Sequence, residues 1–324
     1  MKAKKILCLV LVAILAVSTL SFTACKKKAK YVVGICQLVT HDALDAATEG
    51  FKEALIEELT KELGEASVEF DLQNAANSAD TCGTIVNTFV SKKVDLILAN
   101  ATPALLAAIN TTSEIPILGT SVTDYGKSLN IKDFNGVVGG NVSGTSDKVL
   151  ASKQAEMIKE LLPDAKTIGF IYCSAEPNSV YQIEEMDAEL KKLGYTTKEY
   201  KFSETTEIAS VAEKAATECD ALYAPTDNTV ASNATTIYDA MGDNKKPLIA
   251  GEKGICTGCG VATLSIDYKE LGRITGRMAA EILLGKSKIS DMAIRYDENP
   301  KKLYNEKICK ELNFTVPAGY EKMS

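Results

Sequence analysis

The 324-residue chain contains no tryptophan and only one histidine, and its acidic residues outnumber the basic ones to give a net charge of −7. A single histidine excludes a zinc site built from several histidines. Without a basic surplus, the chain lacks the charge that neutralises phosphates, which disfavours nucleic-acid binding. No dinucleotide-binding glycine loop, P-loop or nucleophile elbow follows a predicted strand. The sequence therefore predicts a protein that is not an enzyme and that needs no metal or organic cofactor.

Long apolar runs are also scarce, and the longest lies at the N-terminus. Three lysines precede an apolar stretch over residues 6–17, which is shorter than a membrane-spanning helix and typical of a secretory signal. Residues 22–25 read Phe-Thr-Ala-Cys and resemble a bacterial lipobox. We therefore expect residues 1–24 to be a lipoprotein signal peptide and Cys25 to carry a lipid. An ordinary secretory signal with an incidental cysteine is the alternative.

Removal of this signal would change the charge and leave a short basic tether. The signal takes three lysines and no acidic residue with it, which brings the net charge from −7 to −10. Residues 25–30 hold four lysines, which suit a lipidated tether beside anionic headgroups. The sequence thus predicts an extracytoplasmic protein that is held at the bacterial cell membrane by lipid and does not span it.

Seven cysteines remain when Cys8 and Cys25 are set aside, and most of them lie in apolar, strand-like segments where a free thiol behaves as a small hydrophobe. Cys256 and Cys259 differ because they have C-x-x-C spacing within a glycine-rich stretch, residues 254–260. Three interpretations stay open for this pair. A glycine-rich loop with unpaired thiols is favoured over a local disulfide, and a metal or redox site comes last.

Beyond residue 30, apolar strand-like runs alternate with amphipathic helical patterns. Residues 31–38 have the pattern of a buried strand, and residues 42–63 that of a helix whose apolar positions share one face. This alternation predicts parallel sheets with helices on both faces. The strands are too many for one such sheet in a chain of this length. The predicted fold class is therefore α/β, with two Rossmann-like lobes joined by a hinge.

The boundary between the lobes is expected at a small polar connector, residues 141–145. The predicted first lobe comprises residues 31–142 plus about 267–290, and the second comprises residues 143–266 plus about 291–324. The same reading predicts a strand over residues 136–140 and a closing helix over residues 302–312.

Ligands of open α/β sheets bind beyond the carboxyl ends of the strands. The loops at these ends are rich in small hydrogen-bonding residues, and several precede helices, whose N-termini favour a carboxylate or a phosphate. Asp227 and Glu252 are suited to hold a cationic group such as an α-ammonium. Helix capping is the alternative role for all of these side chains. The candidate ligand-binding residues are Gln37, Thr40, Ala101, Thr102, Ser121, Val122, Asn178, Ser179, Thr226, Asp227, Asn228 and Glu252.

Several segments, taken in order, carry a resemblance that covers residues 31–320. They include DALDAATEGFKEAL at 42–55, NATPA at 100–104, NVSGTSD at 141–147, YAPTDNTVAS at 223–232 and ATLSIDYKELGRITG at 262–276. With these motifs the chain resembles the substrate-binding lipoprotein of an ABC importer, of the kind associated with tryptophan and tyrosine uptake.

The resemblance implies a type I periplasmic-binding-protein fold whose two lobes close on a small ligand. It also implies an ABC permease and its ATPase as partners, a monomeric state, and no chemistry on the ligand. Carried over by position, the residues that would face the ligand are Thr102, Ser121 and the N–H groups around Val122 from the first lobe, and Asn178, Ser179, Asp227 and Asn228 from the second.

An aromatic amino acid (tryptophan, tyrosine or phenylalanine) is the favoured ligand. A sugar or another small polar solute is the alternative within the binding class, although sugar sites often use tryptophan faces and this chain has none. A ligand-sensing surface lipoprotein with the same fold also stays open.

Overall fold

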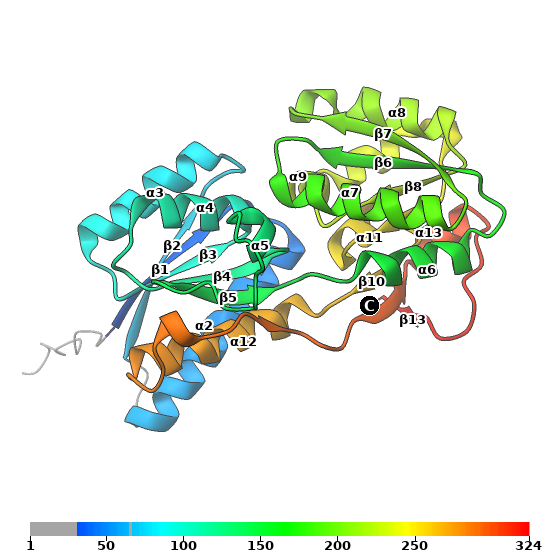
Figure 1. Ribbon diagram of the computed structural model, residues 1–324. Helices are drawn as coiled ribbons and strands as arrows, with labels where there is room; N and C mark the ends of the chain where they lie inside the picture. Colours follow the sequence, from blue (N-terminus) through cyan, green and yellow to red (C-terminus); the bar gives the residue numbers. More distant parts are fainter. Residues whose placement is uncertain (1–30, 65–66, 324) are drawn as a thin grey trace, which may run out of the picture. The chain divides into compact units, whose positions relative to one another are not determined.

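The computed structural model describes residues 31–64 and 67–323, which form two β-sheets flanked by helices (Figure 1). By its internal contacts the chain separates into residues 1–30 and a compact unit over residues 31–324. The predicted signal peptide, the lipidation site Cys25 and the tether at 25–30 lie outside the described residues. Within the described residues, none of the helices combines the length and the apolarity that a membrane span requires.

The first sheet has six parallel strands in the order β11-β5-β4-β3-β1-β2. Helices α2 and α12 cover one of its faces and α3 and α4 cover the other (Figure 1). The sheet and these helices are called the first lobe. Its elements are β1 Tyr31–Gln37, α2 Asp42–Leu63, β2 Val68–Asn74, α3 Ala79–Lys92, β3 Leu96–Asn100, α4 Thr102–Thr111, β4 Ile117–Val122, α5 Tyr125–Ser128, β5 Val142–Ser146, α12 Tyr268–Leu283, the 3₁₀ turn Ile289–Asp291 and β11 Arg295–Tyr296.

The second sheet has seven strands in the order β13-β12-β10-β9-β8-β6-β7, and all neighbours are parallel except β10 and β12. This sheet and its helices share one buried core and are called the second lobe. Its elements are α6 Ala151–Leu161, β6 Thr167–Cys173, α7 Pro177–Lys192, β7 Thr196–Phe202, α8 Ile208–Glu218, β8 Ala221–Ala224, α9 Asn228–Ser232, α10 Ala234–Ala240, β9 Leu248–Ala250, α11 Lys253–Cys259, β10 Ala262–Ser265, β12 Lys301–Tyr304, α13 Glu306–Glu311 and β13 Glu321–Lys322, with 3₁₀ turns at Thr205–Glu207 and Gly242–Asn244.

The chain passes between the two sheets three times, after β5, after β10 and after β11. The second passage leads into α12, which packs closely along α2 in the first lobe (Figure 1). Glycines make this approach possible, because a Cβ at Gly272 would collide with the backbone carbonyl of Ala47. The predicted α/β class with two parallel, helix-covered sheets is confirmed, and so is the helix over residues 42–63.

The predicted polar connector at residues 141–145 is wrong, because all but the first of these residues belong to the buried strand β5. Its small polar residues serve close packing. A Cβ at Gly144 would collide with the carbonyl oxygen of Gly119 on β4, and the hydroxyl of Ser143 donates to the carbonyl of Met292 at 3.0 Å. Residues 136–140 form only isolated bridges and not the predicted strand. Since β5 and β11 both pair within the first sheet, that lobe extends to Ser146 and includes residues 295–296, a few residues beyond the expected boundaries.

Two further segments differ from the prediction. The expected helix over residues 302–312 begins as β12, which pairs antiparallel with β10, and only Glu306–Glu311 is helical. Asn305 caps this helix by accepting hydrogen bonds from the N–H groups of residues 307 and 308, so the helix cannot extend through the strand. The expected glycine-rich loop around Cys256 and Cys259 is the helix α11, in which both cysteines are free and buried.

Candidate functional site

The loops beyond the carboxyl ends of the two sheets enclose a small cavity between the lobes. Its volume is about 10 Å³, which is the space of about one water molecule. Direct hydrogen bonds join the lobes beside it: Nε2 of His41 lies 3.2 Å from Oδ1 of Asn228, and Asn77 donates to the hydroxyl of Thr229 at 2.9 Å. The lining residues are His41, Leu44, Ser121, Thr123, Asp147, Asn178, Thr226, Asp227, Asn228, Ala231, Glu252 and Tyr268.

Six of the twelve predicted ligand-binding residues line this cavity, namely Ser121, Asn178, Thr226, Asp227, Asn228 and Glu252. The other six lie outside its lining. Gln37 is held within the first lobe, where its amide donates to Asp45 at 2.6 Å and its carbonyl accepts from Thr48 at 2.7 Å. Thr40 accepts a hydrogen bond from Asn74. The remaining four, Ala101, Thr102, Val122 and Ser179, are buried and do not line the cavity.

Asp227 is the N-cap of α9, and both of its oxygens are occupied. Oδ1 accepts from the N–H of Val230 at 2.8 Å and Oδ2 accepts from the N–H of Cys173 at 2.7 Å. Burial, and after it the nearby charge of Glu176, raises the pKa of this carboxyl well above its usual range. The side chain therefore fixes the start of α9 against the end of β6.

Glu176 and Glu252 hold helix N-termini in the same way. Oε1 of Glu176 accepts from the backbone N–H and the hydroxyl of Thr229, and Oε2 accepts from the N–H and the amide of Asn228, all between 2.7 and 3.1 Å. Glu252 caps α11 by accepting from the N–H groups of Gly254 and Ile255. Its burial raises its pKa, while the nearby His41 opposes this rise. The alternative interpretation of these acidic residues as helix caps is thus what the geometry shows.

Asn178 presents an amide to the cavity from the first turn of α7. Its amide nitrogen donates to the carbonyl of Thr226 at 3.1 Å, whereas its carbonyl oxygen is buried without a partner. Gln182, one turn further along α7, donates to the same carbonyl and accepts from the N–H of Thr226. These contacts fix the orientation of Asn178, so that its free oxygen is a ready acceptor.

On the first-lobe side, the backbone itself is shaped at the loop ends. Ala101, the residue before α4, has φ 93°, and Ser121, near the end of β4, has φ 54°. Non-glycine residues rarely take these positive values, and such strain concentrates at functional sites. Ser121 lines the cavity with a buried hydroxyl that has no partner. Thr102 also has a buried, unpartnered hydroxyl, but it lies outside the cavity lining.

Asp147 is the most informative residue that the sequence reasoning missed. It follows β5 on the first passage between the lobes and is buried. Its Oδ2 accepts a hydrogen bond from the hydroxyl of Tyr268 at 2.8 Å, and its Oδ1 has no partner. Burial raises the pKa of the carboxyl to about 6, although the hydroxyls of Tyr268 and Thr123 favour its charged form. Asp147 is the last residue of the motif NVSGTSD. Because residues 141–145 were expected to form a connector, Asp147 was not placed beyond the end of a strand, where binding residues were sought.

Unpartnered polar atoms concentrate in this one cavity. Four of the eight buried side-chain atoms without a hydrogen bond in the described chain belong to its lining residues. They are Nδ1 of His41, the hydroxyl of Ser121, Oδ1 of Asp147 and Oδ1 of Asn178. A buried polar atom without a partner costs free energy, so native proteins rarely keep several together unless a ligand or water uses them. The cavity therefore offers hydrogen-bonding partners for a small polar group, whether of a water molecule or of a ligand.

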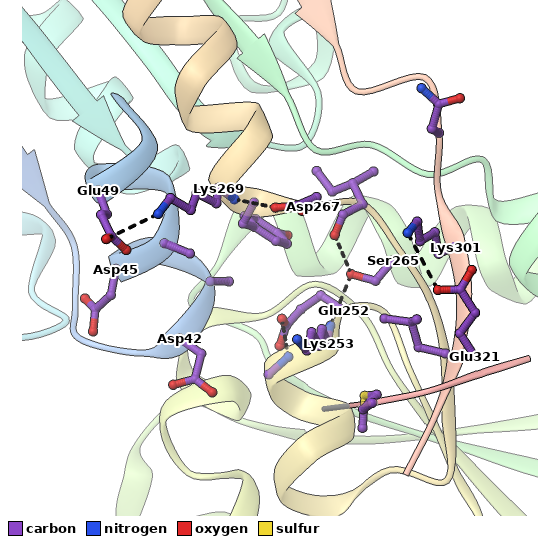
Figure 2. Close-up of a pocket in the computed structure, with 18 of the residues that line it drawn as sticks. Asp42, Asp45, Glu49, Glu252, Lys253, Ser265, Asp267, Lys269, Lys301 and Glu321 are labelled. Carbon is purple, nitrogen blue, oxygen red and sulfur yellow. Dashed lines mark hydrogen bonds and ion pairs between the residues drawn. The ribbon is translucent and has the colours of Figure 1, made fainter. Parts of the chain in front are cut away.

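A larger pocket of about 680 Å³ lies beside the second passage between the lobes (Figure 2). Two of its lysines are in ion pairs: Lys269 pairs with Glu49 at 3.3 Å, and Lys301 pairs with Glu321 at 3.6 Å. None of the unpartnered buried atoms of the described residues belongs to its lining. Among all residues that the structure describes, no three His, Cys, Asp or Glu side chains are arranged to hold a metal ion. Size alone therefore does not identify this pocket as the binding site.

Comparison with known proteins gives consistent results. The family model described as ABC transporter substrate binding protein matches residues 32–322. A tyrosine-binding protein of Clostridioides difficile is 37% identical over 327 residues, which is 96% of this chain and 93% of that protein.

Among solved structures, a Streptococcus pneumonia protein in complex with L-Trp is 32% identical, with a TM-score of 0.84 over 90% of this chain and 99% of its own. A substrate-binding protein with adhesive properties from Clostridium difficile, in a ligand-free, open structure, is 34% identical, with a TM-score of 0.67 over 91% and 99% of the two chains. Because the family model spans nearly all described residues, the chain belongs to the ABC transporter substrate-binding proteins.

Proposed function

We propose that this protein captures an aromatic amino acid in the cavity between its lobes. The observation that carries the proposal is the group of four unpartnered polar atoms that converge there from both lobes. An amino acid offers both hydrogen-bond donors and acceptors to such a group. The relatives supply the ligand class, since one is a tyrosine-binding protein and another was solved with L-Trp.

The proposal requires the lobes to move. A cavity of about 10 Å³ has no room for an aromatic side chain, so the ligand enters only when the lobes separate. At similar sequence identity, this chain superimposes better on the complex with L-Trp than on the ligand-free, open structure. The three passages between the sheets are the hinge on which this separation takes place.

Within the cavity we assign hydrogen bonds with the ligand's polar groups to Ser121 from the first lobe and to Asn178 from the second, because both keep an unpartnered buried atom. Asp227 and Glu252, which the sequence offers as partners for an ammonium group, already accept two backbone hydrogen bonds each. Their principal role in our proposal is to hold α9 and α11 in place around the ligand.

The wider function follows from the family and the N-terminus. We propose that the mature protein is extracytoplasmic, that lipid on Cys25 anchors it to the bacterial cell membrane, and that it delivers its ligand to an ABC permease driven by an ATPase. The apolar run at residues 6–17, the lipobox-like residues 22–25 and the lysines that follow support the anchor. Incorporation of labelled lipid that is lost in Cys25→Ala tests it.

Because the chain has no tryptophan, added L-tryptophan is the only indole in a binding experiment. We expect its fluorescence to shift to the blue on mixing with residues 26–324. L-tyrosine and L-phenylalanine should raise the unfolding temperature, because a ligand at about 100 times its Kd stabilises a protein by about 2.7 kcal/mol. D-glucose should have no effect. Failure of all three aromatic amino acids to bind would overturn the proposal.

A pair of serine variants locates the site. Ser121→Ala removes an unpartnered hydroxyl from the cavity and should weaken binding about tenfold, the usual value of one buried hydrogen bond. Ser91→Ala, on the exposed face of α3, is the matched control and should bind as the wild type does. Equal affinities for the two variants would place the ligand elsewhere.

A further inference from the structure

The cavity contains acidic side chains and no strong cation. Asp147, Asp227 and Glu252 line it, and none of its twelve lining residues in the described chain is a lysine or an arginine. A buried carboxylate is stable only when it is paired or hydrogen-bonded. The three carboxyls differ in how far this requirement is met.

Asp227 and Glu252 are fully hydrogen-bonded, because each of their oxygens accepts from a backbone N–H group. Asp147 is hydrogen-bonded on one oxygen only. Its Oδ2 accepts from Tyr268, while its Oδ1 is buried without a partner in a residue that lines the cavity. Among the acidic residues of the lining, Asp147 alone keeps a complete oxygen for a ligand.

The basic residue that follows Asp147 in the chain forms no ion pair with it. Lys148 is its neighbour in the chain, but its ammonium pairs with Asp124 at 2.9 Å and with Glu185 at 3.0 Å. The other groups around the carboxyl are the hydroxyls of Tyr268 and Thr123, and Glu252, whose charge is of the same sign. His41 is the remaining titratable group that can become positive in the lining, and it contacts Asn228 across the cavity.

We propose that Asp147 binds the α-ammonium group of the ligand through Oδ1 and thereby makes the site specific for amino acids over their desamino analogues. This inference rests on the proposed function, because it names the residue that reads one group of the same ligand. Asp147 lies on the first passage between the lobes, and Tyr268 is the first residue of α12, where the second passage ends. An ammonium bound at Oδ1 therefore contacts the hinge directly, which links ligand binding to the movement of the lobes.

The raised pKa of Asp147 gives the assignment a pH signature. The free carboxyl titrates at about 6, and only its charged form attracts an ammonium. Affinity for L-tyrosine should therefore be nearly constant above about pH 7 and fall about tenfold by about pH 5. Asp227, Glu252 and His41 also line the cavity and can contribute to the pH dependence of the affinity. The contribution of Asp147 is the part of this pH dependence that disappears when Asp147 is replaced.

The experiment compares L-tyrosine with 3-(4-hydroxyphenyl)propanoate, which lacks only the amino group, by isothermal titration calorimetry. The wild type should bind L-tyrosine at least about 100-fold more tightly, since an unpaired buried charge is costly. Asp147→Asn should reduce this preference to less than about tenfold and flatten the pH profile. The isosteric amide can still accept from Tyr268. Asp42→Asn, which removes an exposed charge on α2 outside the cavity lining, should retain the preference.

Tyr268→Phe provides a second test that keeps the carboxylate. It should retain a strong preference for L-tyrosine, because Oδ1 is unchanged. A purely structural role of Asp147 predicts that Asp147→Asn weakens both ligands equally, and that outcome would overturn the inference while leaving the proposed function intact. A wild type that binds no aromatic amino acid would overturn the proposed function and this inference with it.

Discussion

The second lobe and the first passage between the lobes use buried carboxyls in opposite ways. Glu176 and Asp227 in the second lobe accept hydrogen bonds on both oxygens, mostly from backbone N–H groups at the start of α9. Asp147, on the passage after β5, has one oxygen bonded and one free. Asp227 and Asp147 line the same cavity, yet only Asp147 leaves an acceptor for another molecule.

The comparison shows that an acidic residue at the carboxyl end of a strand is not by itself a ligand-binding group. In the second lobe such residues stabilise helix N-termini, where negative charge and the free N–H groups attract each other. At the hinge, Asp147 accepts a hydrogen bond from Tyr268 on one oxygen only, and in our proposal the ammonium group of the ligand provides the missing partner.

The largest effect is expected in the second lobe, for Glu176→Gln. The amide of the variant places N–H donors against the backbone N–H groups of Asn228 or Thr229, so buried donors lose their acceptor. We expect the free energy of unfolding to fall by about 3 kcal/mol, measured by chemical denaturation. Glu184→Gln, at an exposed site on α7, is the control and should be neutral. A neutral Glu176→Gln would remove the distinction between the two kinds of carboxyl.

Asp147→Asn should have the opposite effect on the ligand-free protein. The folded pKa is about 6 against 3.8 as the reference, so the folded state holds this proton more tightly than the unfolded state does. Stability from this group is present below about pH 4 and is lost as the pH rises through about 6. The variant lacks this loss and should gain up to about 3 kcal/mol relative to the wild type between these pH values.

Denaturation curves of the wild type, Asp147→Asn and Asp42→Asn over this pH range measure the effect. Other buried acids are present in both proteins, so the difference between wild type and variant isolates Asp147. A difference that stays constant with pH would show that the carboxyl is not destabilised by burial.

The smallest effect concerns the ion pairs beside the hinge. Lys148 contacts Asp124 of the first lobe and Glu185 on α7 of the second. These side chains are partly exposed, so we expect Glu185→Gln to weaken L-tyrosine binding by about two- to fivefold, and less at high salt. Glu189→Gln is the matched control, because Glu189 pairs only with Lys192 within α7 among the ion pairs of the described chain. Identical affinities for the two variants would show that this pair does not help to hold the lobes together.

The sequence predicted the fold well because hydrophobic periodicity determined most elements. The helix over residues 42–63 and the strand within residues 31–38 lie where their apolar patterns place them. Errors occurred where polarity was misleading. Residues 141–145 are small and polar, yet they form a buried strand because Gly144 and Ser143 permit close contact with β4 and with residue 292. Composition alone does not distinguish a flexible connector from a tightly packed strand.

The candidate site was predicted in part. The rule that ligands bind beyond strand ends found Ser121, Asn178 and Asp227, which line the cavity. The rule also selected Gln37 and Thr40, whose side chains are bonded within the first lobe and lie outside the lining. Which polar atoms remain unpartnered depends on contacts far apart in the chain. Asp147 and Tyr268, for example, are 121 residues apart.

The most direct test of the account is a crystal structure of the mature protein with L-tyrosine. We predict that the ligand lies between the lobes, with its amino nitrogen within hydrogen-bonding distance of Oδ1 of Asp147 and its other polar groups near Ser121 and Asn178. An amino nitrogen placed against Asp227 or Glu252, or a ligand in the larger pocket of Figure 2, would contradict it.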